Sequence, residues 1–85
     1  MIESMITGSQ IRSARFALRW TVTDLSFHSS VSVRTIKRME VDDGVPNSTS
    51  ENIAAIKSAL ESAGIEFIGT PTDRPGIRIG TPKPD

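Results

Sequence analysis

The 85-residue sequence contains no cysteine. A disulfide framework and a thiolate zinc site are therefore excluded, and an apolar core must supply the stability, with a second subunit as one way to complete it. The length suits one small domain, and no segment of the chain repeats.

Residue types that serve catalysis are also scarce. The chain has no tyrosine and a single histidine, His28, which by itself makes neither a metal site nor a catalytic triad. No glycine-rich phosphate loop is present, and no serine stands in a nucleophile-elbow pattern. We therefore predict that the protein is not an enzyme and that it needs no cofactor and no metal.

Long hydrophobic runs are absent as well, which predicts that no segment spans a membrane. The N-terminal residues MIESM lack the charged segment and the apolar run of a signal peptide. A cytoplasmic location is the expectation.

The formal net charge is zero, but the charges are unevenly distributed along the chain. Residues 12–38 hold six arginines and lysines against one aspartate, a balance of +5, whereas residues 39–66 hold six acidic residues against one lysine, a balance of −5. This distribution predicts a basic half, which would attract phosphate, and an acidic half, which would limit nonspecific binding.

Apolar residues recur at three- and four-residue steps in four segments, which predicts a mainly α-helical fold with four helices over residues 8–64. Residues 1–7 precede them as a flexible lead-in. The first helix is expected to open at Gly8, with Ser9 as its N-cap, and to end near residue 20.

The second and third helices are separated by only a few residues. Thr21 is the expected N-cap of the second helix, and Asp24 completes a near capping box. The serines at 29–30 favour a turn. Ser32 then caps a third helix, which should run to about residue 41.

Residues 42–50, DDGVPNSTS, combine a glycine, a proline and several capping residues and predict a loop. Ser48 or Thr49 can cap the fourth helix, which should run to about residue 63. Gly64 then stands where a helix end favours a left-handed residue.

Beyond this glycine, the segments IEFIG and GIRIG are rich in β-branched and aromatic residues and predict a short C-terminal β-hairpin over residues 65–80 with a long turn, TPTDRP, between its strands. Residues 81–85 form a flexible tail. Because the apolar residues alternate with polar ones, each strand should present one apolar face. We expect this face to build a homodimer through Ile65, Phe67, Ile77 and Ile79.

The segment from Thr21 to Val41 is typical of a helix-turn-helix, in which a polar, basic second helix follows a tight turn. One apolar residue in the first helix (Leu25), one in the turn (Val31) and one in the second helix (Ile36) would hold the two helices at a steep angle. The outer face of the second helix would then project from the body and fit a major groove of about 12 Å.

In this stretch, WTVTDLSFHSSVSVRTIKRME, the chain resembles the phage Cro/repressor-type (XRE) family of helix-turn-helix DNA-binding regulators. The flanking segments IRSARFALRW and GVPNSTSENIAAIKSALESAGIEF resemble the first and later helices of that family, so the likeness covers about residues 8–68. It implies a four-helix repressor-like domain, double-stranded DNA as the partner, and repression through an operator bound as a homodimer.

The resemblance also implies roles for single residues. Base edges would be read by Val33, Arg34 and Arg38. An arginine of the first helix, Arg15, would pair with Glu40. Phosphate contacts are expected, partly on this basis and partly from the charge pattern, at Thr21, Thr23, Ser32, Thr35, Lys37, Arg12 and Arg19.

Two positions depart from the family pattern. Val22 stands where the family usually has a phosphate-binding glutamine, and Ser30 stands where it usually has a glycine in the turn. Two alternatives to a dedicated repressor therefore stay open. One is an antitoxin-like DNA-binding protein that also binds a second protein, and the other is a protein-binding module that has lost DNA binding.

Overall fold

The computed structural model describes residues 5–80; the first four and last five residues, which include the expected tail, lie outside the described residues. Four helices are followed by a two-stranded antiparallel hairpin, as predicted. The helices are α1 (Gly8–Ala17), α2 (Val22–Ser29), α3 (Val33–Val41) and α4 (Ser50–Ser62), and the strands are β1 (Ile65–Thr70) and β2 (Asp73–Ile79).

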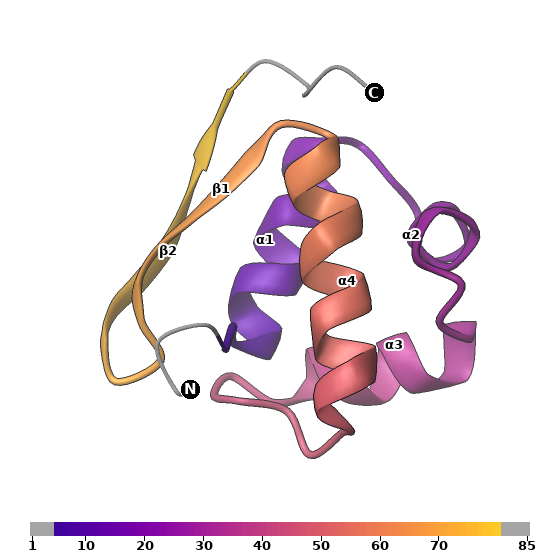
Figure 1. Ribbon diagram of the computed structural model, residues 1–85, viewed down its shortest axis with the longest axis horizontal. Coiled ribbons are helices and arrows are strands. Elements are labelled where there is room, and N and C mark those ends of the chain that lie inside the picture. Colours follow the sequence, from indigo (N-terminus) through magenta and orange to yellow (C-terminus); the bar gives the residue numbers. More distant parts are fainter. Residues whose placement is uncertain (1–4, 81–85) are drawn as a thin grey trace.

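The helices surround one core, and the hairpin closes one side of it. In Figure 1, α4 runs down the centre beside α1, α3 crosses the bottom, and α2 is seen end-on at the opposite side from the hairpin. Strand β2 contacts α1, and β1 contacts α4. The hairpin therefore covers α1 and α4, on the side of the molecule opposite to α2.

Most of the core comes from the apolar residues at the predicted helical spacing. The predicted helix-turn-helix residues Leu25, Val31 and Ile36 all lie within it. Within residues 5–80, the other members of this core cluster are Ile6, Ile11, Ala14, Met39, Ile53, Ile56, Leu60 and Ile65. Because these residues come from every helix and from β1, the core joins the whole described chain into one unit.

The start of α1 differs from the prediction. Thr7, not Ser9, is the N-cap: its hydroxyl accepts a hydrogen bond from the backbone N–H of Gln10, and the Gln10 side chain accepts one from the N–H of Thr7. Ile6 and Thr7 are buried, so a flexible lead-in that extends to residue 7 is wrong for these two residues. The sequence Thr-Gly-Ser-Gln carries the capping-box spacing and could have indicated this start.

The other helix caps follow the sequence closely. Thr21 and Asp24 form a complete capping box at the start of α2. Ser32 caps α3, and Thr49 rather than Ser48 caps α4. Gly64, which follows α4, has a left-handed φ of 104°, as its position predicted.

The hairpin turn is shorter than expected. The strands extend until Thr70 pairs with Asp73, so the prediction of a long turn is wrong and only residues 71–72 connect the strands. A bulge at Gly69, with φ of 75°, shifts the register just before the turn. A β-carbon at this glycine would lie 2.2 Å from the carbonyl oxygen of Arg74, so only glycine allows the strands to continue this far.

Gln10 ties the hairpin to α1. Its side-chain Nε2 donates to the carbonyl oxygen of Gly76 at 2.8 Å and to that of Ile68 at 3.3 Å, and these two residues face each other across the strands. The same side chain therefore completes the cap of α1 and holds both strands. This contact explains how a two-stranded sheet, which is marginal alone in water, is held in place.

Candidate nucleic-acid interface

The connection between α2 and α3 is a tight, internally hydrogen-bonded turn. Ser30 has a left-handed backbone, with φ of 62°, at the position where the resemblance led us to consider a glycine. The hydroxyl of Ser29 donates to the carbonyl oxygen of Leu25 at 2.7 Å and accepts from the N–H of Val31 at 3.2 Å. Val31 can thus turn into the core, and α3 leaves the turn at a steep angle to α2 (Figure 1).

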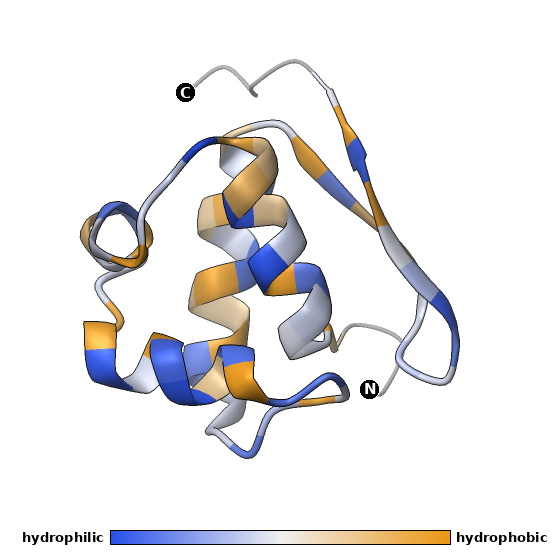
Figure 2. Ribbon diagram, turned by 180° about the vertical axis from the view of Figure 1, so that it is seen from behind, coloured by the Kyte–Doolittle hydropathy of each residue, from blue (hydrophilic) through white to orange (hydrophobic). Residues whose placement is uncertain are grey.

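Helix α3 has two sharply different faces. Ile36, Met39 and Glu40 are buried. Arg34, Lys37 and Arg38 are exposed on the other side. Seen from behind, the ribbon of α3 alternates between hydrophilic and hydrophobic segments along its length, as a helix at the edge of a core should (Figure 2).

The three cations of α3 have no acidic partner in the part of the chain that the structure describes. The ion pairs found there use Arg12, Arg15, Lys57, Arg74 and Arg78. Arg34, Lys37 and Arg38 therefore present their charges to solvent, and a phosphate or a base edge would meet them without first breaking an internal ion pair.

The buried face of α3 is fixed to α1 by the expected pair of Arg15 and Glu40. Arg15 Nε lies 2.8 Å from Glu40 Oε2, and Arg15 Nη2 lies 2.8 Å from Glu40 Oε1, so the two groups meet side by side through two hydrogen bonds. The hydrogen bond to Glu40 raises the pKa of Arg15, although burial acts in the opposite direction. The pair is largely shielded from water, and its two charge-assisted hydrogen bonds have the geometry of the stronger hydrogen bonds in proteins.

Gly8 brings the start of α1 against the end of α3. A β-carbon at Gly8 would lie 2.0 Å from the carbonyl oxygen of Asp42 and 2.2 Å from that of Met39. The N–H of Gly8 donates to the carbonyl oxygen of Gly44 at 2.9 Å. Only a residue without a side chain permits this approach, so Gly8 and the Arg15–Glu40 pair together determine where α3 lies.

Arg12, a predicted phosphate contact, already has protein partners. Its Nη1 donates to the backbone carbonyl of Glu40, and its Nη2 lies 3.2 Å from a carboxylate oxygen of Asp43. A phosphate would have to compete with both acceptors. Arg19, in the turn after α1, is exposed and takes part in none of the ion pairs within residues 5–80, so it is better placed than Arg12 to meet a phosphate.

The polar residues predicted to meet phosphate lie at the two helix starts. Thr21 and Thr23 are exposed at the start of α2. Ser32 and Thr35 lie at the start of α3, where the hydroxyl of Ser32 donates to that of Thr35 at 2.9 Å and accepts from its N–H at 3.2 Å. The side chains of this second pair are therefore partly engaged in capping α3.

Two apolar residues of α3, Val33 and Val41, also contribute to its exposed surface. Val33, predicted to read bases, is half-buried at the first turn. Val41, which the sequence analysis did not single out, is 80% exposed at the last residue of α3. A hollow beside it, of about 500 Å³, is lined by Arg38, Val41, Asp42 and Asn47.

The four residues predicted to build a dimer are not equally available. In the hairpin, Ile65 pairs with Ile79 and Phe67 with Ile77. Ile65, however, is only 2% exposed within the single chain, so its predicted role as a dimer contact is wrong. Phe67 and Ile77 are partly covered by the core, and Ile79 alone is largely exposed, at 64%.

An aromatic cluster formed by α2 and the residue Trp20 before it was not predicted. The rings of Trp20 and His28 stack at 4.3 Å between centroids, and Phe27 meets His28 edge-on at 5.4 Å. Phe27 is 83% exposed. Within the described residues, no group of three or more metal-ligating side chains forms, and His28 serves this cluster instead.

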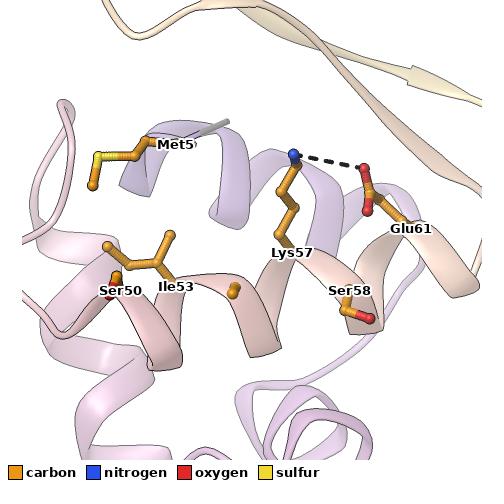
Figure 3. Close-up of a pocket in the computed structure, with 7 residues that line it drawn as sticks. Met5, Ser50, Ile53, Lys57, Ser58 and Glu61 are labelled. Atoms are coloured by element: carbon orange, nitrogen blue, oxygen red, sulfur yellow. Dashed lines mark ion pairs between the residues drawn. The ribbon is translucent and has the colours of Figure 1, made fainter. Parts of the chain in front are cut away.

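A second hollow, of about 230 Å³, lies along α4 beside Met5 (Figure 3). It is lined by Met5, Ser50, Ile53, Ala54, Lys57, Ser58 and Glu61. The Lys57–Glu61 pair at its rim, 4.0 Å apart, joins successive turns of one helix, so it is an ordinary surface pair. None of the residues that line this hollow belongs to α3, so the hollow is not part of the α3 surface.

Comparison with known proteins finds no match to any protein-family model and no curated relative of this chain. Among residues 5–80, no helix is long and apolar enough to cross a membrane.

Proposed function

We propose that the protein is a sequence-specific DNA-binding regulator that inserts α3 into the major groove. The observation that carries this proposal is the row formed by Arg34, Lys37 and Arg38, which is exposed and unpaired with any carboxylate in the described chain. Unpaired cations attract the phosphate backbone, and arginine can bond guanine O6 and N7 together.

The resemblance of residues 8–68 to the phage Cro/repressor-type family supports the same reading. In this proposal Arg34 and Arg38 read bases, and Lys37 and the threonines at the start of α2 meet phosphate. Repression is the simplest mechanism, because occupancy of an operator needs only the DNA-binding surface.

Binding as a homodimer is part of the proposal, with the hairpin as the contact. Ile79 is the main exposed residue of the hairpin's apolar face. The hairpin edges also carry backbone groups that a second copy can pair with. A two-fold axis at the hairpin would place two copies of α3 on one duplex, about 34 Å apart.

Because Ile65 belongs to the core, deletion of the hairpin would also remove part of the core, so a lost dimer would not be attributable to the hairpin contact alone. The variant Ile79→Lys tests it instead, with Thr72→Lys at the exposed turn as the control for added charge. Sedimentation at micromolar concentration should show a dimer for the parent and the control and a monomer for Ile79→Lys. A dimer in all three proteins would reject the hairpin contact.

Selection from a random duplex pool, followed by titration of the selected site, tests DNA binding itself. Arg34→Ala and Arg38→Ala should each weaken specific binding by about 1–3 kcal/mol and relax the preference at one position. Arg74→Ala removes the same charge at the hairpin tip, where the side chain is exposed, and should leave specific binding unchanged. Parent-like binding by both α3 variants would refute the proposal.

One observation favours a second candidate, a protein-binding module. Phe27 is almost fully exposed on α2, next to the stacked pair of Trp20 and His28, and Val22 occupies the first position of that helix. A module of this kind would select no duplex from the random pool. It would retain a protein from native lysate, and Phe27→Ala would release that protein while Arg34→Ala would not.

A further inference from the structure

Val41 lies at the C-terminal end of the outward row of α3. It stands three residues after Arg38 and seven after Arg34, so the three side chains share one helix face. Ile36, on the opposite face, is fully buried. An 80% exposed valine among cations gains nothing from the fold of the single chain, because burial in the core is what usually stabilises such a side chain.

The surroundings of Val41 disfavour a phosphate as its partner. It is the last residue of α3, where the helix dipole is negative, and the exposed carboxylate of Asp42 follows directly. The hollow bordered by Val41, Arg38 and Asn47 leaves space beside the valine methyl groups. An apolar group that arrives together with a hydrogen-bond acceptor for Arg38 fits this end of α3 better than a phosphate does.

We propose that Val41 contacts the 5-methyl group of a thymine next to the guanine read by Arg38, an inference that rests on the DNA-binding function proposed above. The thymine methyl is the apolar feature of the major groove, and aliphatic side chains read it by contact. Three residues of helix advance about 4.5 Å, against ~3.4 Å for one base pair. The thymine is therefore expected roughly one or two base pairs from the guanine.

Replacement of single thymines by uracil in the selected duplex tests this contact. The substitution removes only the methyl group and keeps the groups that pair with adenine. One thymine near the guanine read by Arg38 should be sensitive to this change. When its methyl group is removed, the affinity of the parent protein for the duplex should fall about fourfold. Val41→Ala should bind the thymine and uracil duplexes equally.

Three variants serve as controls in the same titration. Val45→Ala, in the loop after α3, should keep the full difference between thymine and uracil at that position. Arg34→Ala should lower affinity for both duplexes and preserve their ratio. Val33→Ala should also preserve the ratio of the two affinities. If Val33→Ala abolishes the difference between the duplexes while Val41→Ala keeps it, the methyl group is read at the start of α3 and the inference is wrong.

The two proposals fail in different ways. If the parent selects no duplex, DNA binding and the thymine contact fall together. If the parent binds a selected duplex that depends on Arg34 and Arg38 but no thymine in it responds to loss of its methyl group, only the thymine contact falls. Thermal melting of Val41→Ala should match the parent, since the side chain lies outside the core.

Discussion

Arg15 on α1 and Glu40 on α3 meet through two hydrogen bonds of 2.8 Å each, in a position largely shielded from water. Arg15 also donates to the carbonyl oxygen of Trp20 at 3.1 Å, and its guanidinium lies 4.6 Å from the centre of the exposed Phe16 ring. One side chain thus links the end of α1, the approach to α2 and the buried face of α3. The orientation of α3 depends on this junction.

Glu40→Ala should strongly destabilise the protein, because it leaves the charge of Arg15 largely buried without a partner. We expect a loss of about 3 kcal/mol in the free energy of unfolding, measured by urea denaturation. Glu61→Ala, which breaks the surface pair with Lys57, should cost less than about 0.5 kcal/mol. Equal unfolding midpoints for the two variants would show that the Arg15–Glu40 pair adds little.

Gly8→Ala should destabilise the protein by at least about 2 kcal/mol, because its methyl group would overlap two backbone carbonyl oxygens at the end of α3. Gly44→Ala is the matched control, since nothing lies within 4 Å of a β-carbon there. Thermal melting compares the two variants directly. A melting temperature of Gly8→Ala close to that of Gly44→Ala would mean that α1 and α3 do not approach so closely.

Gln10→Glu should loosen the hairpin. The new carboxylate can still accept the hydrogen bond from Thr7, but it would direct a second oxygen at the carbonyl groups of Ile68 and Gly76. We expect a loss of about 2 kcal/mol in stability and faster amide hydrogen exchange in β1 and β2. Asn52→Asp makes the same change at the matching position of α4, where an acidic residue is favourable, and should be neutral or slightly stabilising.

Ser30→Gly should stabilise the protein by about 1 kcal/mol, because a left-handed backbone strains serine but not glycine. The opposite result is expected for Ser26→Gly within α2, where glycine costs roughly 0.5 kcal/mol. Urea unfolding of both variants measures the two signs. A destabilised Ser30→Gly would show that the serine side chain contributes more to the turn than its backbone strain removes.

Local features of the chain were predictable because they depend on residues within one or two helical turns of each other. The caps at Thr21 and Ser32 and the left-handed Gly64 follow from hydrogen-bonding side chains and backbone preference at single positions. Two local features escaped prediction. Thr7 and Ser9 lie in the same polar segment, and the N-cap was assigned to the wrong one of the two. Nothing in the neighbouring sequence distinguishes Gly69, at the bulge, from an ordinary loop glycine.

The sequence by itself determined the four helices, the hairpin and the charge of the outer face of α3, because helical spacing and strand alternation assign each side chain to a face. Only the tertiary structure decided which charges are free. Arg12 is engaged by residues 28 and 31 positions away, and Gln10 by residues 58 and 66 positions away, and no local pattern reports contacts at such separations. The Arg15–Glu40 pair was expected from the family resemblance and not from a local pattern. The burial of Ile65 and the exposure of Val41 were decided in the same way, because each depends on how the elements pack rather than on the pattern within one element.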